Sequence, residues 1–206
     1  MQKTLKNLIL PMISTIFALG LFAIAVPNAL AAVTFNSDIM QISNVTQDGS
    51  CSNCWASSKN ANPGDLISIK LKYKNIGTEL AQNVLVRISD PNPGNTYDDF
   101  TFTGKILANS SNGGIMIEDD SVFLDIQGGS EETIIFVPGS LRWYDNNNPA
   151  NNLTPQIGSG WEQDVFGSSG ISLGNITPNN SSDDGSFVVH FRIGDDTSQE
   201  SVTTNN

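Results

Sequence analysis

The sequence predicts an all-β protein, an immunoglobulin-like antiparallel β-sandwich preceded by an N-terminal signal helix. Beyond residue 32, apolar residues come in short runs that alternate with polar ones, the two-residue period of strands with one covered face. Gly, Asn, Pro, Ser and Asp separate these runs at the spacing of seven or more short strands, and no long stretch has helical apolar spacing. A β-barrel is the alternative architecture.

Residues 1–32 have the pattern of a cleaved signal peptide. Lys3 and Lys6 precede an apolar run over residues 8–26, and residues 29–31 (Ala-Leu-Ala) offer the small side chains that signal peptidase requires. An uncleaved membrane anchor is the alternative, because the apolar run approaches the length of a bilayer span. Either way, the segment predicts that the protein is extracellular or lies at the cell surface.

The first predicted strand covers residues 33–46 and places Phe35, Met40 and Ile42 in the core. Residues 47–63 are polar and are expected to form a loop that holds both cysteines. Within this loop Pro63 presets φ for a turn, and the glycine that follows it can take the positive φ that the turn needs.

Residues 66–76 give the clearest strand, and residues 84–89 repeat its alternation as the expected hairpin partner. In the first of these strands, Ile67, Ile69, Leu71 and Tyr73 are expected to face inward, and Ser68, Lys70, Lys72 and Lys74 outward. In the second, Val84, Val86 and Ile88 are expected inward, and Leu85 and Arg87 outward. One charged face on each strand predicts a sheet that is covered on one side only.

The remaining strands are expected at residues 100–107, 115–117, 122–126, 133–137, 171–173 and 187–193. Residues 145–160 are dense in Asn and Pro and predict a loop. The last strand places Phe187, Val189, Phe191 and Ile193 inward. Residues 33–194 therefore predict a single domain, and the polar residues 195–206 a disordered tail.

Five short segments together resemble a known family. They are Asn-Pro-Gly-Asp at residues 62–65, Asn-Ile-Gly at 75–77, Ala-Gln-Asn-Val at 81–84, Phe-Val-Pro-Gly-Ser at 136–140 and Leu-Gly-Asn-Ile-Thr-Pro at 173–178. Their order and spacing over residues 62–193 resemble the conserved repeat domain of bacterial and archaeal surface proteins, the domain of unknown function eleven. The resemblance implies an immunoglobulin-like sandwich in a cell-surface or wall-associated protein, and it implies no catalytic residues.

Cys51 and Cys54 are the only two cysteines of the chain. In an exported protein such a pair is expected to form a disulfide, which here would brace a surface loop. A redox-active pair is the alternative, but it requires a βαβ setting that the sequence does not show.

Three sets of side chains are candidate binding sites. The first is a basic strip for docking another copy, an envelope protein or a wall polymer, formed by Lys70, Lys72, Lys74 and Arg87. The second is a set of loop acids with oxygen ligands suited to calcium, formed by Asp98, Asp99, Asp119, Asp120, Asp145, Asp183 and Asp184. The third is a set of aromatic residues that would stack on glycans, formed by Trp55, Trp143, Tyr144 and Trp161. Solvated or core-covering roles are the alternative for each set.

Composition excludes several functions. With 10 basic and 21 acidic residues, the chain repels phosphate backbones, so nucleic acid is not an expected partner. The chain has a single histidine, predicted on an outer strand face, so few side chains suit acid–base catalysis near neutral pH. No catalytic motif is present. The sequence therefore predicts an exported structural or adhesive module without catalytic activity and without an obligatory cofactor. The alternative is an extracellular module that binds glycan or calcium.

Overall fold

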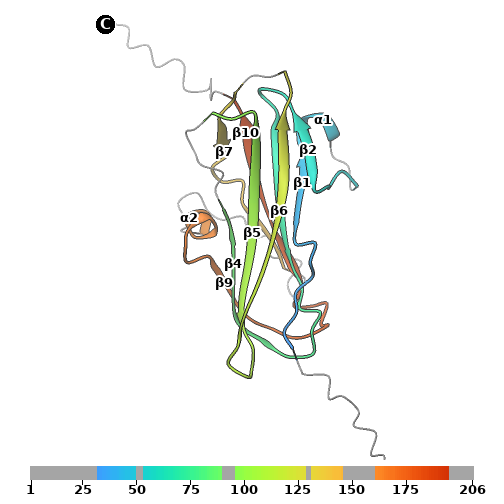
Figure 1. Cartoon of the computed structure of the whole chain (residues 1–206), viewed down its shortest axis with the longest axis vertical. Coiled ribbons are helices and arrows are strands. Elements are labelled where there is room, and N and C mark those ends of the chain that lie inside the picture. Colours follow the sequence, from blue (N-terminus) through green and yellow to red (C-terminus); the bar gives the residue numbers. More distant parts are fainter. Residues whose placement is uncertain (1–31, 50–52, 90–95, 129–130, 146–160, 195–206) are drawn as a thin grey trace, which may run out of the picture. The chain divides into compact units, whose positions relative to one another are not determined.

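The computed structural model describes residues 32–49, 53–89, 96–128, 131–145 and 161–194, which belong to one compact unit (Figure 1). It is mostly β, with 56% strand and 5% helix, which confirms the all-β class. Residues 1–31 and 195–206 lie outside the described residues, and so do the predictions of a signal helix and of a disordered tail.

The first sheet has β1 (Met40–Asn44), β3 (Leu66–Tyr73), β10 (Gly185–Ile193) and β7 (Ile134–Phe136) in that order. A further strand, β8 (Arg142–Asp145), pairs with the first half of β10, whereas β7 pairs with its last residues. All pairs in this sheet are antiparallel. The last strand of the domain is therefore a central strand, with neighbours on both sides.

The second sheet has β2 (Ser58–Ala61), β6 (Ile115–Ile126), β5 (Asp99–Asn109), β4 (Ala81–Ile88) and β9 (Ile171–Ile176) in that order. The strands β4, β5 and β6 form an antiparallel meander, and β2 runs parallel to the end of β6. Two short helices complete the described elements: α1 (Val45–Asp48) follows β1, and α2 (Trp161–Phe166) lies beside β4 and β9 (Figure 1). Neither helix is predicted by apolar spacing, because both are too short to show it.

The core lies between the two sheets and is built from the inward positions that the alternation predicts. Phe35, Met40 and Ile42 are buried, as are the predicted inward residues of β3, β4 and β10. Phe102 of the second sheet meets Phe191 of the first at 4.9 Å between ring centroids. Gly104 lets the sheets approach closely, because a Cβ there would lie 2.3 Å from the sulfur of Met40.

The predicted hairpin of residues 66–76 and 84–89 is wrong, because β3 and β4 belong to different sheets. Asn75 accounts for the difference. Its buried amide donates to the carbonyls of Glu79 and Ile176, and its Oδ1 accepts from Gly77 N, so that the connection arches from one sheet to the other. A Cβ at Gly77 would lie 2.2 Å from the carbonyl oxygen of Ala32, which requires glycine at this point of the arch.

Three other predicted elements differ from the structure. The expected loop at residues 47–63 contains β2, whose polar residues are accommodated at the edge of the sheet. Residues 115–117 and 122–126 belong to one strand, β6, because Asp120 finds a partner in the Met40 amide at 2.9 Å and does not interrupt pairing with β5. The strand β8 begins before the expected loop at residues 145–160, most of which lies outside the described residues.

The topology bears on the immunoglobulin-like prediction. In the immunoglobulin order the last strand lies beside the preceding strand in one sheet. Here β10 pairs with β3, while β9 lies in the other sheet beside β4. A two-sheet β-sandwich is shown, and its immunoglobulin-like identity stays a prediction.

Candidate functional site

The lysine face is the outer side of the first sheet where Lys70, Lys72 and Lys74 lie. All three project from this side, as the alternation predicts, because the residues between them are buried in the core. Arg87 does not join them, contrary to the predicted docking strip. It lies on β4 in the second sheet, where its guanidinium donates to the Ser168 carbonyl at 3.2 Å.

Each of these lysines has a partner within the chain. Lys72 pairs with Asp38 and Lys74 with Asp184, both at 2.8 Å, and the ammonium of Lys70 lies 3.7 Å from the ring centroid of Trp55. Burial lowers the pKa of Lys70, and the charge of Lys72 lowers it further. The three lysines therefore form local pairs, in which three ammonium groups meet two carboxylates and one aromatic ring.

A groove opens on this face with a volume of about 290 Å³. Three of its residues form one row across adjacent strands: Lys72 on β3 is paired with Ser186 on β10, which is paired with Tyr144 on β8. Lys74, Asp184 and Asn36 line the neighbouring part of the groove. Local alternation predicted the lysines, but not the groove, because its other residues come from distant parts of the chain.

His190 lies on the same outer face, as predicted, where its Nδ1 is 2.7 Å from the Ser68 hydroxyl. Burial lowers the pKa of His190, and the charge of Arg142 lowers it further.

We expect the free energy of unfolding to fall as the pH is lowered below about 6.5, the ordinary pKa of histidine. The reason is that the unfolded state then takes up the proton before the folded state does, and the loss is complete once the pH passes below the folded pKa. A His190→Gln variant should lose this part of the pH dependence, measured by urea unfolding at a series of pH values. Equal slopes for the two proteins between pH 7 and pH 5 would contradict the assignment.

The four aromatic residues predicted to stack on glycans do not converge. Trp143 turns into the core, where it stacks on Phe187 at 5.3 Å and donates to the Tyr73 hydroxyl at 2.7 Å. Tyr144, the next residue along β8, faces outward and is 44% exposed. Trp55 is held by Lys70, and the side chain of Trp161 lies outside the described residues. Strand alternation separates Trp143 from Tyr144, so only the tyrosine of that pair is available to a ligand.

The acidic residues predicted to bind calcium are also dispersed. Asp98, Asp99, Asp119 and Asp120 lie on or next to β5 and β6, whereas Asp183 and Asp184 precede β10. Asp120 and Asp183 each accept a bond from a backbone amide, and Asp184 pairs with Lys74. The side chain of Asp145 lies outside the described residues. Among the described residues no three acidic, histidine or cysteine side chains are grouped as metal ligands, and calcium binding stays a prediction.

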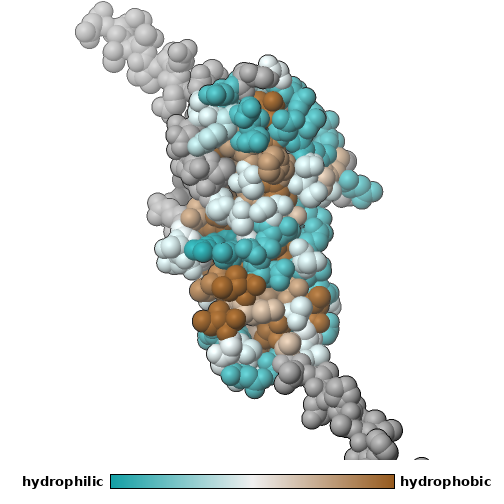
Figure 2. All heavy atoms as spheres, viewed as in Figure 1, coloured by the Kyte–Doolittle hydropathy of each residue, from teal (hydrophilic) through white to brown (hydrophobic). Residues whose placement is uncertain are grey.

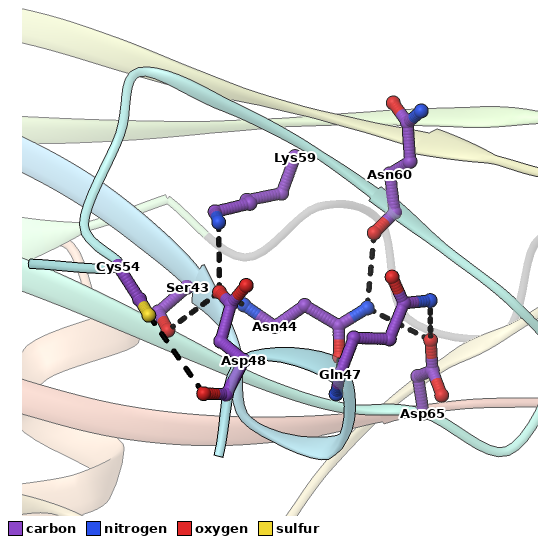
Figure 3. Close-up of polar contacts among 8 residues, drawn as sticks. All are labelled: Ser43, Asn44, Gln47, Asp48, Cys54, Lys59, Asn60 and Asp65. Atoms are coloured by element: carbon purple, nitrogen blue, oxygen red, sulfur yellow. Dashed lines mark hydrogen bonds and ion pairs between the residues drawn. The ribbon is translucent and has the colours of Figure 1, made fainter. Parts of the chain in front are cut away.

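A polar cluster that sequence reasoning missed lies at the other end of β3 (Figure 3). The Asp65 carboxylate is buried and accepts hydrogen bonds from Asn44 Nδ2 at 2.8 Å, Gln47 Nε2 at 2.7 Å and the Asn62 amide at 2.9 Å. Asn44 Nδ2 also donates to the Asn60 carbonyl at 2.9 Å. The cluster thus joins β1, α1, β2 and the Asn-Pro-Gly-Asp turn, and its role is structural. Gly64 has a φ of +87°, as the turn prediction requires.

Asp48 anchors the neighbouring cysteine loop. Its carboxylate lies 2.7 Å from the Lys59 ammonium and accepts from the Ser43 hydroxyl and the Asn44 amide (Figure 3). The hydrogen bond from Lys59 is the largest cause that lowers the pKa of Asp48, against the opposing effect of burial. The sulfur of Cys54, which is disulfide-bonded, contacts the Asp48 carbonyl oxygen at 3.8 Å. Cys51 lies outside the described residues, so the pairing of these two cysteines stays a prediction.

An apolar row crosses the outer face of the second sheet. Leu85 on β4 is paired with Leu107 on β5, which is paired with Ile117 on β6. Ile117 is 52% exposed, and Ile115, two residues earlier on β6, is 72% exposed. Figure 2 shows apolar residues gathered on this side of the domain, above the turn between β5 and β6. Alternation predicted that Leu85 faces outward, but it could not reveal the row, which forms only when β4, β5 and β6 pair.

Comparison with known proteins identifies no relative. No protein-family model, curated protein or solved structure matches the chain. The resemblance to the conserved repeat domain therefore stays a prediction. Among the described residues, no helix has the length and apolar character that crossing a membrane requires.

Proposed function

We propose that the protein is a structural or adhesive module of the cell exterior, without catalytic activity, whose copies associate through the outer face of the second sheet. The observation that carries this proposal is the apolar row, in which Ile117 and the neighbouring Ile115 are exposed while Leu85 and Leu107 are half-buried. Contiguous exposed apolar residues on a folded protein commonly mark an interaction surface.

The edge of the same sheet supports the proposal. Among the described strands, β2 pairs with β6 only over Phe123–Ile126. The first half of β6 is therefore paired with β5 on one side and with no described strand on the other. Unpaired N–H and C=O groups of an edge strand can pair with a strand of another chain. The part of β6 that precedes Asp120, the residue whose carboxylate contacts the Met40 amide of β1, thus offers backbone hydrogen bonds beside the apolar row.

Charges on the outer face of the second sheet favour a second copy of this chain as its binding partner. Beside the apolar row lies a row in which Arg87 is paired with Lys105, and Lys105 with Asp119. A surface with both signs of charge can complement itself when two copies meet. The chain as a whole is acidic, so copies repel at long range, and salt that screens this repulsion is expected to strengthen association.

An extracellular location is part of the proposal and is supported by two observations. The first residues have the pattern of an export signal, and Cys54 is disulfide-bonded, a state that persists in oxidising compartments.

We expect the dissociation constant for self-association of an Ile115→Thr/Ile117→Thr variant to be at least about tenfold higher than that of the unaltered protein. Threonine keeps the β-branched shape that suits a strand, but it removes apolar surface from the interface. Sedimentation velocity of the purified protein at low and high salt measures the association, and fractionation of cells tests whether the same variant leaves the envelope.

Ile76→Thr is the matched control, since this isoleucine is 42% exposed but lies outside the apolar row. It should associate as the unaltered protein does. A protein that stays monomeric at high concentration, or a double variant that associates as well as the control, would show that this face does not mediate association.

A further inference from the structure

The groove on the lysine face combines features that the structural proposal does not use. Gly185 and Tyr73 are among its lining residues, and a side chain at this glycine would clash with the Tyr73 hydroxyl. Its walls carry ammonium groups, a serine hydroxyl and an exposed tyrosine ring. A cavity of about 290 Å³ has the size of a small polar ligand.

One oxygen in the groove lacks a partner. Lys74 Nζ contacts Oδ2 of Asp184 at 2.8 Å, whereas Oδ1 of the same carboxylate is buried and has no hydrogen-bond partner among the described residues. A buried acceptor without a donor costs free energy, and such an oxygen is commonly satisfied by a ligand or by water. Asp184 lines the groove but this oxygen is closed to solvent, so a ligand hydroxyl supplies the missing hydrogen bond only when the Asp184 side chain turns toward the groove.

The row of Lys72, Ser186 and Tyr144 lies beside this oxygen. The ring of Tyr144 is exposed on the outer face, where the apolar side of a sugar ring can stack on it. Lys72 is 30% exposed and its partner Asp38 is 63% exposed, so the pair is weak and its ammonium can turn to an anion. The three lysines that line the groove outnumber its one carboxylate, Asp184, which favours an anionic ligand.

We propose that this groove binds one acidic sugar residue of an anionic saccharide. Tyr144 stacks on the ring, the ammonium groups of Lys72 and Lys74 bind the carboxylate, and Asp184, whose side chain turns toward the groove on binding, accepts a hydrogen bond from a ring hydroxyl. The site lies on the first sheet and self-association is proposed for the second, so each proposal can fail without the other.

The test titrates the purified protein with tetragalacturonate, with its neutral counterpart galactotetraose, and with inorganic phosphate, all in the presence of a chelator. We expect saturable binding of tetragalacturonate, with NMR shift changes at the amides of Lys72, Tyr144 and Ser186. Galactotetraose should bind at least tenfold more weakly, and phosphate should not displace the saccharide at equal concentration.

Tyr144→Ser and Lys72→Gln should each weaken binding of tetragalacturonate about tenfold or more. Tyr97→Ser is the matched control, because this tyrosine is 37% exposed and lies outside the groove. Thermal melts establish that all three variants are folded. Equal binding of the neutral saccharide, displacement by phosphate, equal binding by the Tyr144 variant, or no saturable binding would each overturn the proposal.

Discussion

Replacing Phe191 with alanine should lower the free energy of unfolding by about 3–5 kcal/mol, the range for a phenylalanine removed from a packed core. Phe191 is 1% exposed and lies on the central strand β10. Its ring meets those of Phe102 at 4.9 Å, Phe166 at 5.8 Å and Phe136 at 6.0 Å. The substitution thus opens a cavity between the two sheets and beneath α2, which rigid neighbouring strands can fill only in part.

Urea unfolding followed by tryptophan fluorescence measures this loss, since Trp143 stacks on Phe187 in the same core. Phe123→Ala is the matched control: this phenylalanine lies on β6 and is 47% exposed, so its removal should cost less than about 1 kcal/mol. A Phe191 variant as stable as the Phe123 variant would mean that the two sheets do not pack through this residue.

The alternation of apolar and polar residues predicted the core correctly because it depends on local geometry. A strand turns successive side chains to opposite faces wherever it lies, so the inward residues of β3, β4 and β10 could be assigned without knowing their partners. Even the turn at Pro63 and Gly64 followed from the preferences of two residues.

The partners of each strand could not be predicted in this way. Adjacent strands in sequence commonly form hairpins, and on that ground the sequence predicts that residues 84–89 pair with residues 66–76. Whether a connection reverses within one sheet or arches to the other depends here on Asn75, whose amide bonds the carbonyl of Ile176, 101 residues away. That contact exists only in the folded domain, and the local sequence pattern does not show it. The prediction that Arg87 joins the lysines is wrong for this reason.

In the candidate site, too, the sequence predicts the local features but not the contacts between distant segments. The three lysines share a face because of their spacing, which the sequence contains. Their partners are 34 residues away for Lys72 and 110 residues away for Lys74, and Tyr144 reaches the groove only through the pairing of β8 with β10. The unpartnered oxygen of Asp184 is a property of the assembled groove, so no motif could have indicated it.

The second large effect is expected for Asp65→Ala, which should lower the free energy of unfolding by about 2–4 kcal/mol. The carboxylate is 6% exposed and accepts three hydrogen bonds, from Asn44, Gln47 and Asn62. Gln47 is exposed and can turn to water, but the Asn44 amide is buried and would keep one hydrogen without an acceptor. Asn62 is likewise exposed, so the cost comes mainly from the Asn44 donor.

The loss should also be visible locally, because the turn is tied to the end of β10. The Gly64 amide donates to the Ile193 carbonyl at 2.7 Å, and the Ile193 amide donates to the Asp65 carbonyl at 3.0 Å. Amide exchange at Ile193 should therefore accelerate in Asp65→Ala, even under conditions where the domain stays folded. Asp99→Ala, at an exposed aspartate at the start of β5, should change neither unfolding nor exchange. If both variants behaved alike, the buried carboxylate would not be what holds the turn to the sandwich.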